Sequence, residues 1–262
     1  KTSLTVAMAK YHADTKNSAS IFFSMEMTKH EIIEKLVADK AMVNPDCFYD
    51  ENQFGVDGND SKTIAAANYL AESNLYIDDK SSATLEHIEH ESRKLKVKHG
   101  SVGFIAVDYL TLMNLPTKDR HDLSVGHVTK KLKELAKELN CILILLIQLN
   151  RKLEDRPDKR PVPSDSRDSG QIEQDCDVWL GLYKDSVYNE SQAEEGVVEI
   201  LVRLNRHSGK GTAIVNSKWG IFTGASNQVL AGYRSTESSK MALDEKQEKQ
   251  ERYRNKNKGF NG

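Results

Sequence analysis

Short runs of apolar residues alternate along the chain with stretches in which apolar residues recur every three or four positions. The short runs predict β-strands at residues 20–24, 75–77, 104–107, 141–147, 178–183, 197–204 and 212–215. The periodic stretches predict helices that begin near residues 6 and 28 and others at residues 62–72, 85–95 and 125–139. Strands that alternate with helices are typical of an α/β domain with a mainly parallel sheet, which is the fold class that we expect.

Two of these segments carry a more specific signal. Residues 141–147 are apolar at every position, which predicts a strand that is covered on both faces, as strands of parallel sheets are. Thr28 and Glu31 have the spacing of a capping box, and this pattern predicts that a helix begins directly after Thr28.

Two further segments lack a regular apolar pattern. Residues 149–168 lie between two predicted strands and are rich in charge and proline, and a connection of this length predicts a functional loop. From residue 234 to residue 262 the chain is polar and charged, so we expect a disordered or marginally helical tail. The predicted organisation is one domain at residues 1–233 followed by this tail.

Composition narrows the class of protein. A chain of 262 residues with 38% hydrophobic residues can bury a core without disulfides or a structural metal. Its three cysteines are widely spaced and odd in number, which favours a reducing compartment. Neither a secretory signal nor an apolar run of about 20 residues is present, so we expect a soluble cytosolic protein. Because the formal net charge is −2, any nucleic-acid site has to be a local one.

Polar side chains lie just past the ends of three of the predicted strands. Glu26 follows the first of these strands, Asp108 the second and Gln148 the third. Taken singly, each is an ordinary residue of a strand end, a helix entry or a loop start. Ligands of open α/β sheets bind at this edge, where an acid, an acid and an amide together fit a magnesium–nucleotide site.

The first residues of the chain add to this hypothesis. Lys1 and Thr2 lead directly into a predicted helix, as the last two residues of a phosphate-binding P-loop do. In such a loop the lysine neutralises phosphate charge and the hydroxyl group binds Mg²⁺. On their own, these two residues are an ordinary helix start. Only the polar residues at the strand ends support their interpretation as part of a P-loop.

Five motifs, in this order, resemble those of the C-terminal RecA-fold ATPase domain of DnaB-type replicative DNA helicases. They are Lys1-Thr2, Ser24-Met25-Glu26-Met27, Asp108-Tyr109-Leu110, Gln148-Leu149-Asn150-Arg151 and the stretch at residues 167–177, Arg-Asp-Ser-Gly-Gln-Ile-Glu-Gln-Asp-Cys-Asp. The last two are far more specific than Walker elements, which many ATPases share. Ile147 stands where the family has serine, and Asp168 where it has glutamate. The resemblance covers roughly residues 1–222 and implies a RecA-like ATPase core.

The resemblance implies a role for each residue of the candidate site. Lys1 and Thr2 would bind the phosphates of ATP, with Thr2 and Asp108 as Mg²⁺ ligands. Glu26 would be the catalytic base, Asp108 the Walker B acid, and Gln148 the residue that couples the γ-phosphate to DNA. ATP and Mg²⁺ are therefore the expected cofactors.

In this family ATP lies between the subunits of a six-membered ring, and an arginine of the neighbouring subunit completes the site. Residues 204–212 resemble the corresponding motif and make Arg206 this arginine finger. The family's lysine two positions earlier is Leu204 here, and Arg203 and Lys210 are open candidates for its replacement. Without the resemblance, Arg206 is a surface charge at the edge of a hairpin.

Contacts with single-stranded DNA are expected in loops that line the pore of the ring. By resemblance, Arg167, Asp168 and Gly170 contact the DNA backbone. The loop at residues 149–168 also supplies six cations against five acids: Arg151, Lys152, Arg156, Lys159, Arg160 and Arg167 against Glu154, Asp155, Asp158, Asp165 and Asp168. Six copies around a pore would place these cations along a phosphate path, whereas in one copy they make an ordinary solvated loop.

A weaker candidate for DNA contact is the loop after Asp108, with Lys118 and Arg120. The chain begins inside a motif, so we expect a piece of a longer protein that lacks the P-loop glycines, the preceding strand and an N-terminal helical domain. As given, it should bind ATP poorly.

The resemblance implies a homo-hexameric, ATP-dependent DNA helicase motor that translocates on single-stranded DNA and unwinds duplex DNA during replication. A helicase loader and a primase are further expected partners, through the N-terminal region. The expected location is the bacterial cytoplasm, with a chromosomal, phage or plasmid origin left open. Two alternatives remain at this stage: a RecA/RadA-type recombinase ATPase, which should differ at residues 165–177, and a nucleotide-dead, ring-forming DNA-binding scaffold.

Overall fold

The structure is a computed structural model, and it describes residues 1–16, 18–50, 59–108, 121–166, 169–189, 196–227 and 229–234. Across these ranges, no helix combines the length and the apolar character needed to cross a membrane. The predicted tail at residues 234–262 lies outside the described residues, apart from its first residue.

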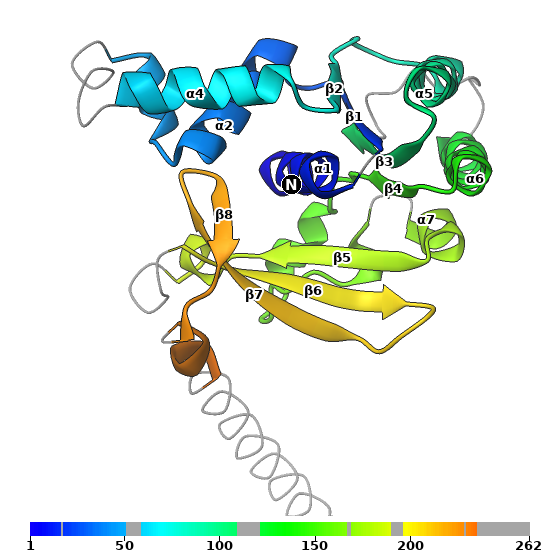
Figure 1. Cartoon of the computed structure of the whole chain (residues 1–262). Helices are drawn as coiled ribbons and strands as arrows, with labels where there is room; N and C mark the ends of the chain where they lie inside the picture. The colour runs from blue at the N-terminus through cyan, green and yellow to red at the C-terminus, as the bar shows by residue number, and fades with distance from the viewer. Residues whose placement is uncertain are drawn as a thin grey trace, which may run out of the picture.

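A four-stranded parallel sheet forms the centre of the domain (Figure 1). Its strands lie in the order β2-β1-β3-β4, and their bounds are Leu75–Asp78, Ala19–Ser24, Val102–Asp108 and Ile142–Leu145. All three strand pairs are parallel, so every strand ends at the same edge of the sheet. The sequence prediction of these four strands is confirmed.

Helices cover both faces of this sheet (Figure 1). The helices are α1 (Thr2–Thr15), α2 (Lys29–Ala41), α4 (Asn59–Ala71), α5 (Leu85–His99) and α6 (His121–Leu139). Alternate residues of β1 point to opposite faces: Ile21 packs with α5 and α6, whereas Phe22 packs with α1 and α2. Because β1 and β3 are covered on both sides, nearly all of their residues are buried.

The capping box predicted before α2 is present. The Thr28 hydroxyl oxygen accepts a hydrogen bond from the Glu31 backbone N–H at 3.3 Å, and the Glu31 carboxylate accepts one from the Thr28 N–H at 2.7 Å. The bond that this carboxylate accepts from the Thr28 N–H, together with one from the Thr28 hydroxyl at 2.9 Å, lowers the pKa of Glu31. The hydrogen bonds of the capping box fix the direction in which the chain leaves β1 and enters α2.

The last strands form a separate antiparallel sheet, and the sequence pattern leaves the pairing of these strands open. This sheet has the order β5-β6-β7-β8, with bounds Val178–Tyr183, Val197–Asn205, Gly211–Lys218 and Ile221–Gly224. β6, β7 and β8 follow one another through short connections, and consecutive strands joined in this way pair antiparallel.

The predicted strand at residues 141–147 is present only in part, as β4, and its coverage is incomplete. β4 is shorter, pairs only with β3 among the described strands, and leaves the Ile142 side chain exposed. The remaining short elements are α7 (Ser169–Asp175) and the 3-10 helices η1 (Pro45–Phe48), η4 (Arg151–Asp155), η5 (Pro163–Asp165) and η6 (Asp185–Val187).

Candidate nucleotide and DNA site

The carboxyl edge of the parallel sheet brings two of the predicted acids to neighbouring strand ends. Ser24, the last residue of β1, is paired with Asp108, the last residue of β3. The Met25 backbone N–H continues this pairing and donates to the Asp108 carbonyl oxygen at 2.8 Å. A tight turn follows, in which the Ser24 hydroxyl donates to the Met27 carbonyl oxygen at 2.6 Å. Glu26 stands on this turn with its side chain exposed to solvent.

Asp108 is fully buried, and its two carboxylate oxygens differ in their surroundings. Oδ2 accepts a hydrogen bond from the Thr2 hydroxyl, whereas Oδ1 has no hydrogen-bond partner among the described residues. Leaving a buried polar atom unpaired is unfavourable and calls for an explanation. A carboxylate and a hydroxyl group are the hard oxygen donors that Mg²⁺ prefers, so the residues present fit this ion.

Lys1 lies at the same edge, at the start of α1. Its ammonium group donates a hydrogen bond to the Ile147 carbonyl oxygen at 3.3 Å, and its side chain is exposed. The next residue, Thr2, is hydrogen-bonded to Asp108, so the start of α1 lies beside this acid.

Gln148 lies further from its strand than the sequence indicated. β4 ends at Leu145, so Gln148 is separated from the strand end by Leu146 and Ile147. It is half-buried, and it directly follows the residue whose carbonyl oxygen binds Lys1. The structure thus brings Lys1, Thr2 and Asp108 together, with Glu26 on the turn after β1 and Gln148 in the segment after β4.

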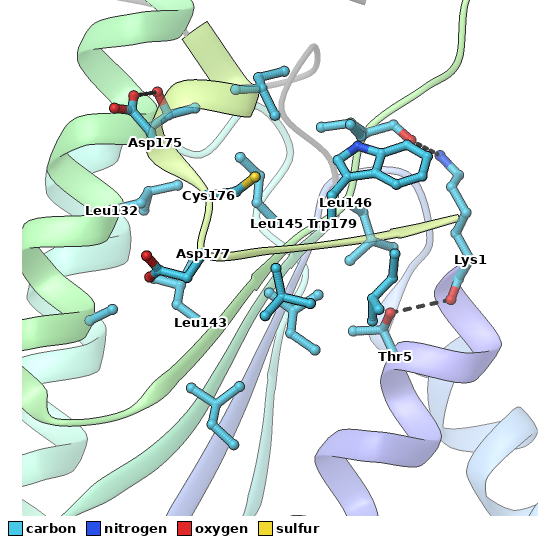
Figure 2. Close-up of a pocket in the computed structure, with 18 of the residues that line it drawn as sticks. Lys1, Thr5, Leu132, Leu143, Leu145, Leu146, Asp175, Cys176, Asp177 and Trp179 are labelled. Carbon is cyan, nitrogen blue, oxygen red and sulfur yellow. Dashed lines mark hydrogen bonds between the residues drawn. The ribbon is translucent and has the colours of Figure 1, made fainter. Parts of the chain in front are cut away.

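An apolar cavity of about 580 Å³ lies between the two sheets and is lined by residues of β4 and β5. Figure 2 shows Lys1 and Thr5 on one side of it and Asp175, Cys176 and Asp177 on the other. Leucine and isoleucine side chains dominate the lining, so the cavity itself offers little to a phosphate. It separates the residues at the start of α1 from the end of α7.

Arg206, the predicted arginine finger, contacts the far side of this cavity. Its Nε donates to the Cys176 carbonyl oxygen at 2.9 Å, and its Nη2 donates to the carbonyl oxygens of Gln174 at 2.5 Å and Glu173 at 3.3 Å. Its backbone N–H also donates to the Asp177 carbonyl oxygen at 2.9 Å. Within one chain Arg206 is therefore engaged with the end of α7 and not with Lys1, Thr2 or Asp108.

Two cations of the predicted DNA loop are occupied by internal ion pairs. Arg156 forms a double hydrogen bond with the Asp165 carboxylate at 2.9 and 2.8 Å. Arg160 forms another with Glu199 of β6, at 2.7 Å for each bond. The expectation that all cations of the loop line a phosphate path is therefore wrong for Arg156 and Arg160.

The loop keeps other cations on the surface. Arg151 and Lys152 of η4 are exposed, as the DNA-binding hypothesis requires. Gly170 is exposed near the start of α7, and a Cβ atom there would meet no atom within 4 Å. Arg167 and Asp168 lie outside the described residues, as does the weaker candidate loop with Lys118 and Arg120 at residues 109–120.

Sequence reasoning missed a polar cluster at the end of α7. The Asp175 carboxylate accepts a hydrogen bond from the Thr129 hydroxyl at 2.5 Å, and the Asp175 carbonyl oxygen accepts one from Lys133 at 2.8 Å. Lys133 also binds the Asp177 carboxylate at 2.8 Å and lowers its pKa. The apolar spacing of α6 gave no signal for these contacts, because Thr129 and Lys133 belong to its polar positions.

Comparison with known proteins gives a consistent result. Residues 1–220 match the family described as "DnaB-like helicase C terminal domain". The chain is 34% identical over 213 residues to "Replicative DNA helicase DnaB" of Haemophilus influenzae, which covers 80% of this chain and 45% of that protein. The corresponding helicase of Pasteurella multocida is 36% identical over 214 residues, again 80% of this chain and 45% of the relative. The chain thus spans about half the length of these curated relatives.

Comparison with solved structures leads to the same group of helicases. One solved ATPase domain superimposes with a TM-score of 0.81 at 28% identity and covers 86% of this chain and 81% of that one. "The Structure Of A DnaB-Like Replicative Helicase And Its Interactions With Primase" gives 0.80 at 28% identity, with 86% and 54% covered. The predicted RecA-like fold class is therefore confirmed.

Proposed function

The chain belongs to the DnaB-like helicase C-terminal domain family, and we propose that it is the motor domain of a replicative DNA helicase that hydrolyses ATP to move along single-stranded DNA. The observation that carries this proposal is the pair of Thr2 and Asp108 at the carboxyl edge of the parallel sheet. Oδ1 of the buried Asp108, which has no partner among the described residues, is a position at which a bound cation would relieve an otherwise unfavourable burial.

Each residue at this edge would have a separate role in ATP hydrolysis. Thr2 and Asp108 would hold Mg²⁺, which neutralises phosphate charge when it is bound. Lys1 would exchange its contact with the Ile147 carbonyl oxygen for the phosphates. Glu26 is exposed on its turn and would accept the proton of the attacking water, and Gln148 would respond to the γ-phosphate.

Arg206 supports an assembly with ATP between subunits. It contacts the end of α7, across the cavity from Lys1, so it cannot complete the site of its own chain in this arrangement. A second copy would supply it. We therefore assign Arg206 as the arginine finger of a neighbouring subunit in a homo-hexamer.

The DNA-contacting residues that we propose are Arg151 and Lys152 of η4 together with Arg167, Asp168 and Gly170. Arg151 and Lys152 follow Gln148 by a few residues, so a change at the nucleotide has a short path to the DNA loop. Their charge would act on phosphates without sequence preference.

ATP turnover of the longer protein that carries this domain, measured with and without single-stranded DNA, tests this function. Glu26→Gln should abolish turnover while ATP still binds, because the variant removes the proton acceptor only. Asp108→Asn should lower Mg²⁺-dependent ATP binding as well. Glu72→Gln removes an exposed carboxylate at the end of α4 and is the matched control, for which wild-type turnover is expected.

Each alternative has its own signature in this experiment. An assembled protein that binds DNA but never turns over ATP would favour a nucleotide-dead scaffold. DNA-stimulated turnover with homologous pairing and no separation of a forked duplex would favour a recombinase. Turnover that survives Asp108→Asn would contradict the assignment of the site.

The remaining partners follow from the relatives. One similar structure is named for a helicase and its interactions with primase, and we propose that a primase and a helicase loader also act with the protein that carries this domain. The relatives are replication helicases of bacteria, so we place this protein in the cytoplasm of a bacterial cell, whether encoded by chromosome, phage or plasmid.

A further inference from the structure

The end of α7 is held by the guanidinium group of Arg206. This group donates to three backbone carbonyl oxygens, those of Glu173, Gln174 and Cys176, and we call these three contacts the α7 latch. The last carbonyl groups of a helix have no partner within the helix and carry the negative end of its dipole. A planar guanidinium group suits them because its donors are fixed in a fork.

α7 depends on such contacts because it is short. It has 7 residues, and an isolated helix of this length is unstable in water. Ile172 is buried in the core, and Lys133 donates to the Asp175 carbonyl oxygen at 2.8 Å. Arg206 supplies a further anchor from outside the helix, since it lies directly after β6.

The other end of α7 carries residues of the proposed DNA site. Gly170 is the second residue of α7, and Arg167 and Asp168 precede the helix in sequence. Anything that loosens the end of α7 therefore acts on a helix whose first turn belongs to the DNA-binding set. Two of the three latch contacts are made by Nη2, so a phosphate of a neighbouring subunit that engages Nη2 would remove both of them and loosen the end of α7.

We infer that Arg206 is a positioning residue with two alternative sets of acceptors: the carbonyl oxygens of α7 in its own chain, and the nucleotide of the neighbouring subunit. When Arg206 holds α7, the helix that carries Gly170 is fixed at its other end. When Arg206 moves to a phosphate, α7 is released and the affinity of that subunit for DNA falls. The second half of this inference rests on the proposed function, whereas the first half does not.

Hydrogen exchange of the full protein, without nucleotide, tests the first half. Arg206→Ala should raise the exchange rate of backbone amides at residues 170–177 by at least about tenfold, because hydrogen bonds to a charged group are lost. Lys133→Met should raise it as well, since it removes the other cation at this helix end. Lys218→Ala removes an exposed cation of the same sheet and should leave α7 unchanged. Unchanged exchange in Arg206→Ala would overturn the inference, even if the protein proves not to be an ATPase.

DNA binding separates positioning from a merely structural effect. Without nucleotide, Arg206→Ala and Lys133→Met should each weaken binding of a labelled single strand, and Arg206→Lys should restore part of the affinity because an ammonium group can still bind carbonyl oxygens. In ATPase assays Lys133→Met should raise the DNA concentration for half-maximal stimulation and keep the maximal rate. Arg206→Lys should keep α7 protected and lose turnover. If Arg206→Ala and the wild type bind the single strand equally well without nucleotide, Arg206 does not position the DNA-binding residues and acts only as an arginine finger.

The second half is tested with ADP and aluminium fluoride, a mimic of the transferred phosphate. In the assembled wild-type protein this mimic should raise exchange at residues 170–177 toward the level of Arg206→Ala, and it should have no further effect on that variant. Binding of the mimic without any change in wild-type exchange would overturn the switch between the two sets of acceptors.

Discussion

Arg160 and Lys152 lie in the same charged loop, yet the structure predicts that their substitution has opposite consequences. Arg160 forms two hydrogen bonds of 2.7 Å with the Glu199 carboxylate, and only 18% and 4% of the two side chains are exposed. Its guanidinium group also lies 4.9 Å from the ring centre of Tyr183. Lys152 is exposed on η4. The pair Arg160→Met and Lys152→Met therefore removes one positive charge in two different settings.

The expected loss of stability follows from what each substitution leaves behind. Arg160→Met leaves the Glu199 carboxylate buried within β6 without a counter-charge, and breaking a buried ion pair in this way costs about 3–5 kcal/mol. Lys152→Met changes a surface side chain and should stay within about 0.5 kcal/mol of wild type. The double variant Arg160→Met with Glu199→Met should recover most of the loss, because two packed apolar side chains replace the pair.

Urea unfolding and salt-dependent DNA binding check both sides of this prediction. Arg160→Met should lower the free energy of unfolding with little change in the salt dependence of DNA binding. Lys152→Met should leave unfolding unchanged and reduce the slope of log affinity against log salt by about 0.7, the value for one phosphate contact of a single strand. A stable Arg160→Met protein with a reduced salt slope would refute the reasoning, because it would make Arg160 a DNA contact.

Two further predictions concern burial around the parallel sheet. Burial raises the pKa of the Cys141 thiol from 9.0 to about 11, so alkylation of this thiol in the folded protein should stay far slower than in urea until the pH approaches 11. The stability that the neutral thiol contributes should be complete below pH 9 and lost as the pH rises toward 11. Equal alkylation rates in the folded and the unfolded protein at pH 8 would contradict this prediction. Gly103→Ala should destabilise the fold by about 1–3 kcal/mol in urea unfolding, because the added Cβ would lie 2.5 Å from both the His12 ring and the Ser18 hydroxyl oxygen. Gly224→Ala meets nothing within 4 Å and should be nearly neutral, so equal losses in the two variants would argue against a clash.

The parallel sheet and its polar edge could be predicted because their signals are local. A buried strand needs only a short apolar run, and its end lies within two residues of where that run stops, so Glu26 and Asp108 could be placed at this edge from the sequence. The strands at residues 178–183, 197–204 and 212–215 were predicted, but their assembly into a separate sheet was not, because apolar runs look alike in both kinds of sheet. β7 and β8 are joined by Trp219 and Gly220 alone, both with positive φ, as in a type I′ hairpin turn. Tryptophan in the place of the usual asparagine concealed that turn.

The partners of the charged residues could not be predicted, since they lie far away in the sequence. Arg160 meets Glu199 across 39 positions, and Arg206 meets the Cys176 carbonyl oxygen across 30. A list of cations in a loop cannot tell a paired arginine from a free one. Backbone carbonyl oxygens, which hold Arg206, leave no trace in the side-chain sequence at all.

The separation of Arg206 from Thr2 and Asp108 also constrains how copies of this chain assemble. If the Arg206 surface of one copy completes the nucleotide site of the next, the two contacting surfaces differ, and the interface is head-to-tail. Such an interface closes into a ring when its rotation divides a full turn, and otherwise it continues into a filament. The proposed helicase ring and the alternative recombinase filament therefore share the same pairwise contact and differ in rotation and rise. Electron microscopy of the assembled protein with ADP and aluminium fluoride separates them, because closed six-membered rings require the helicase geometry and open helical filaments exclude it.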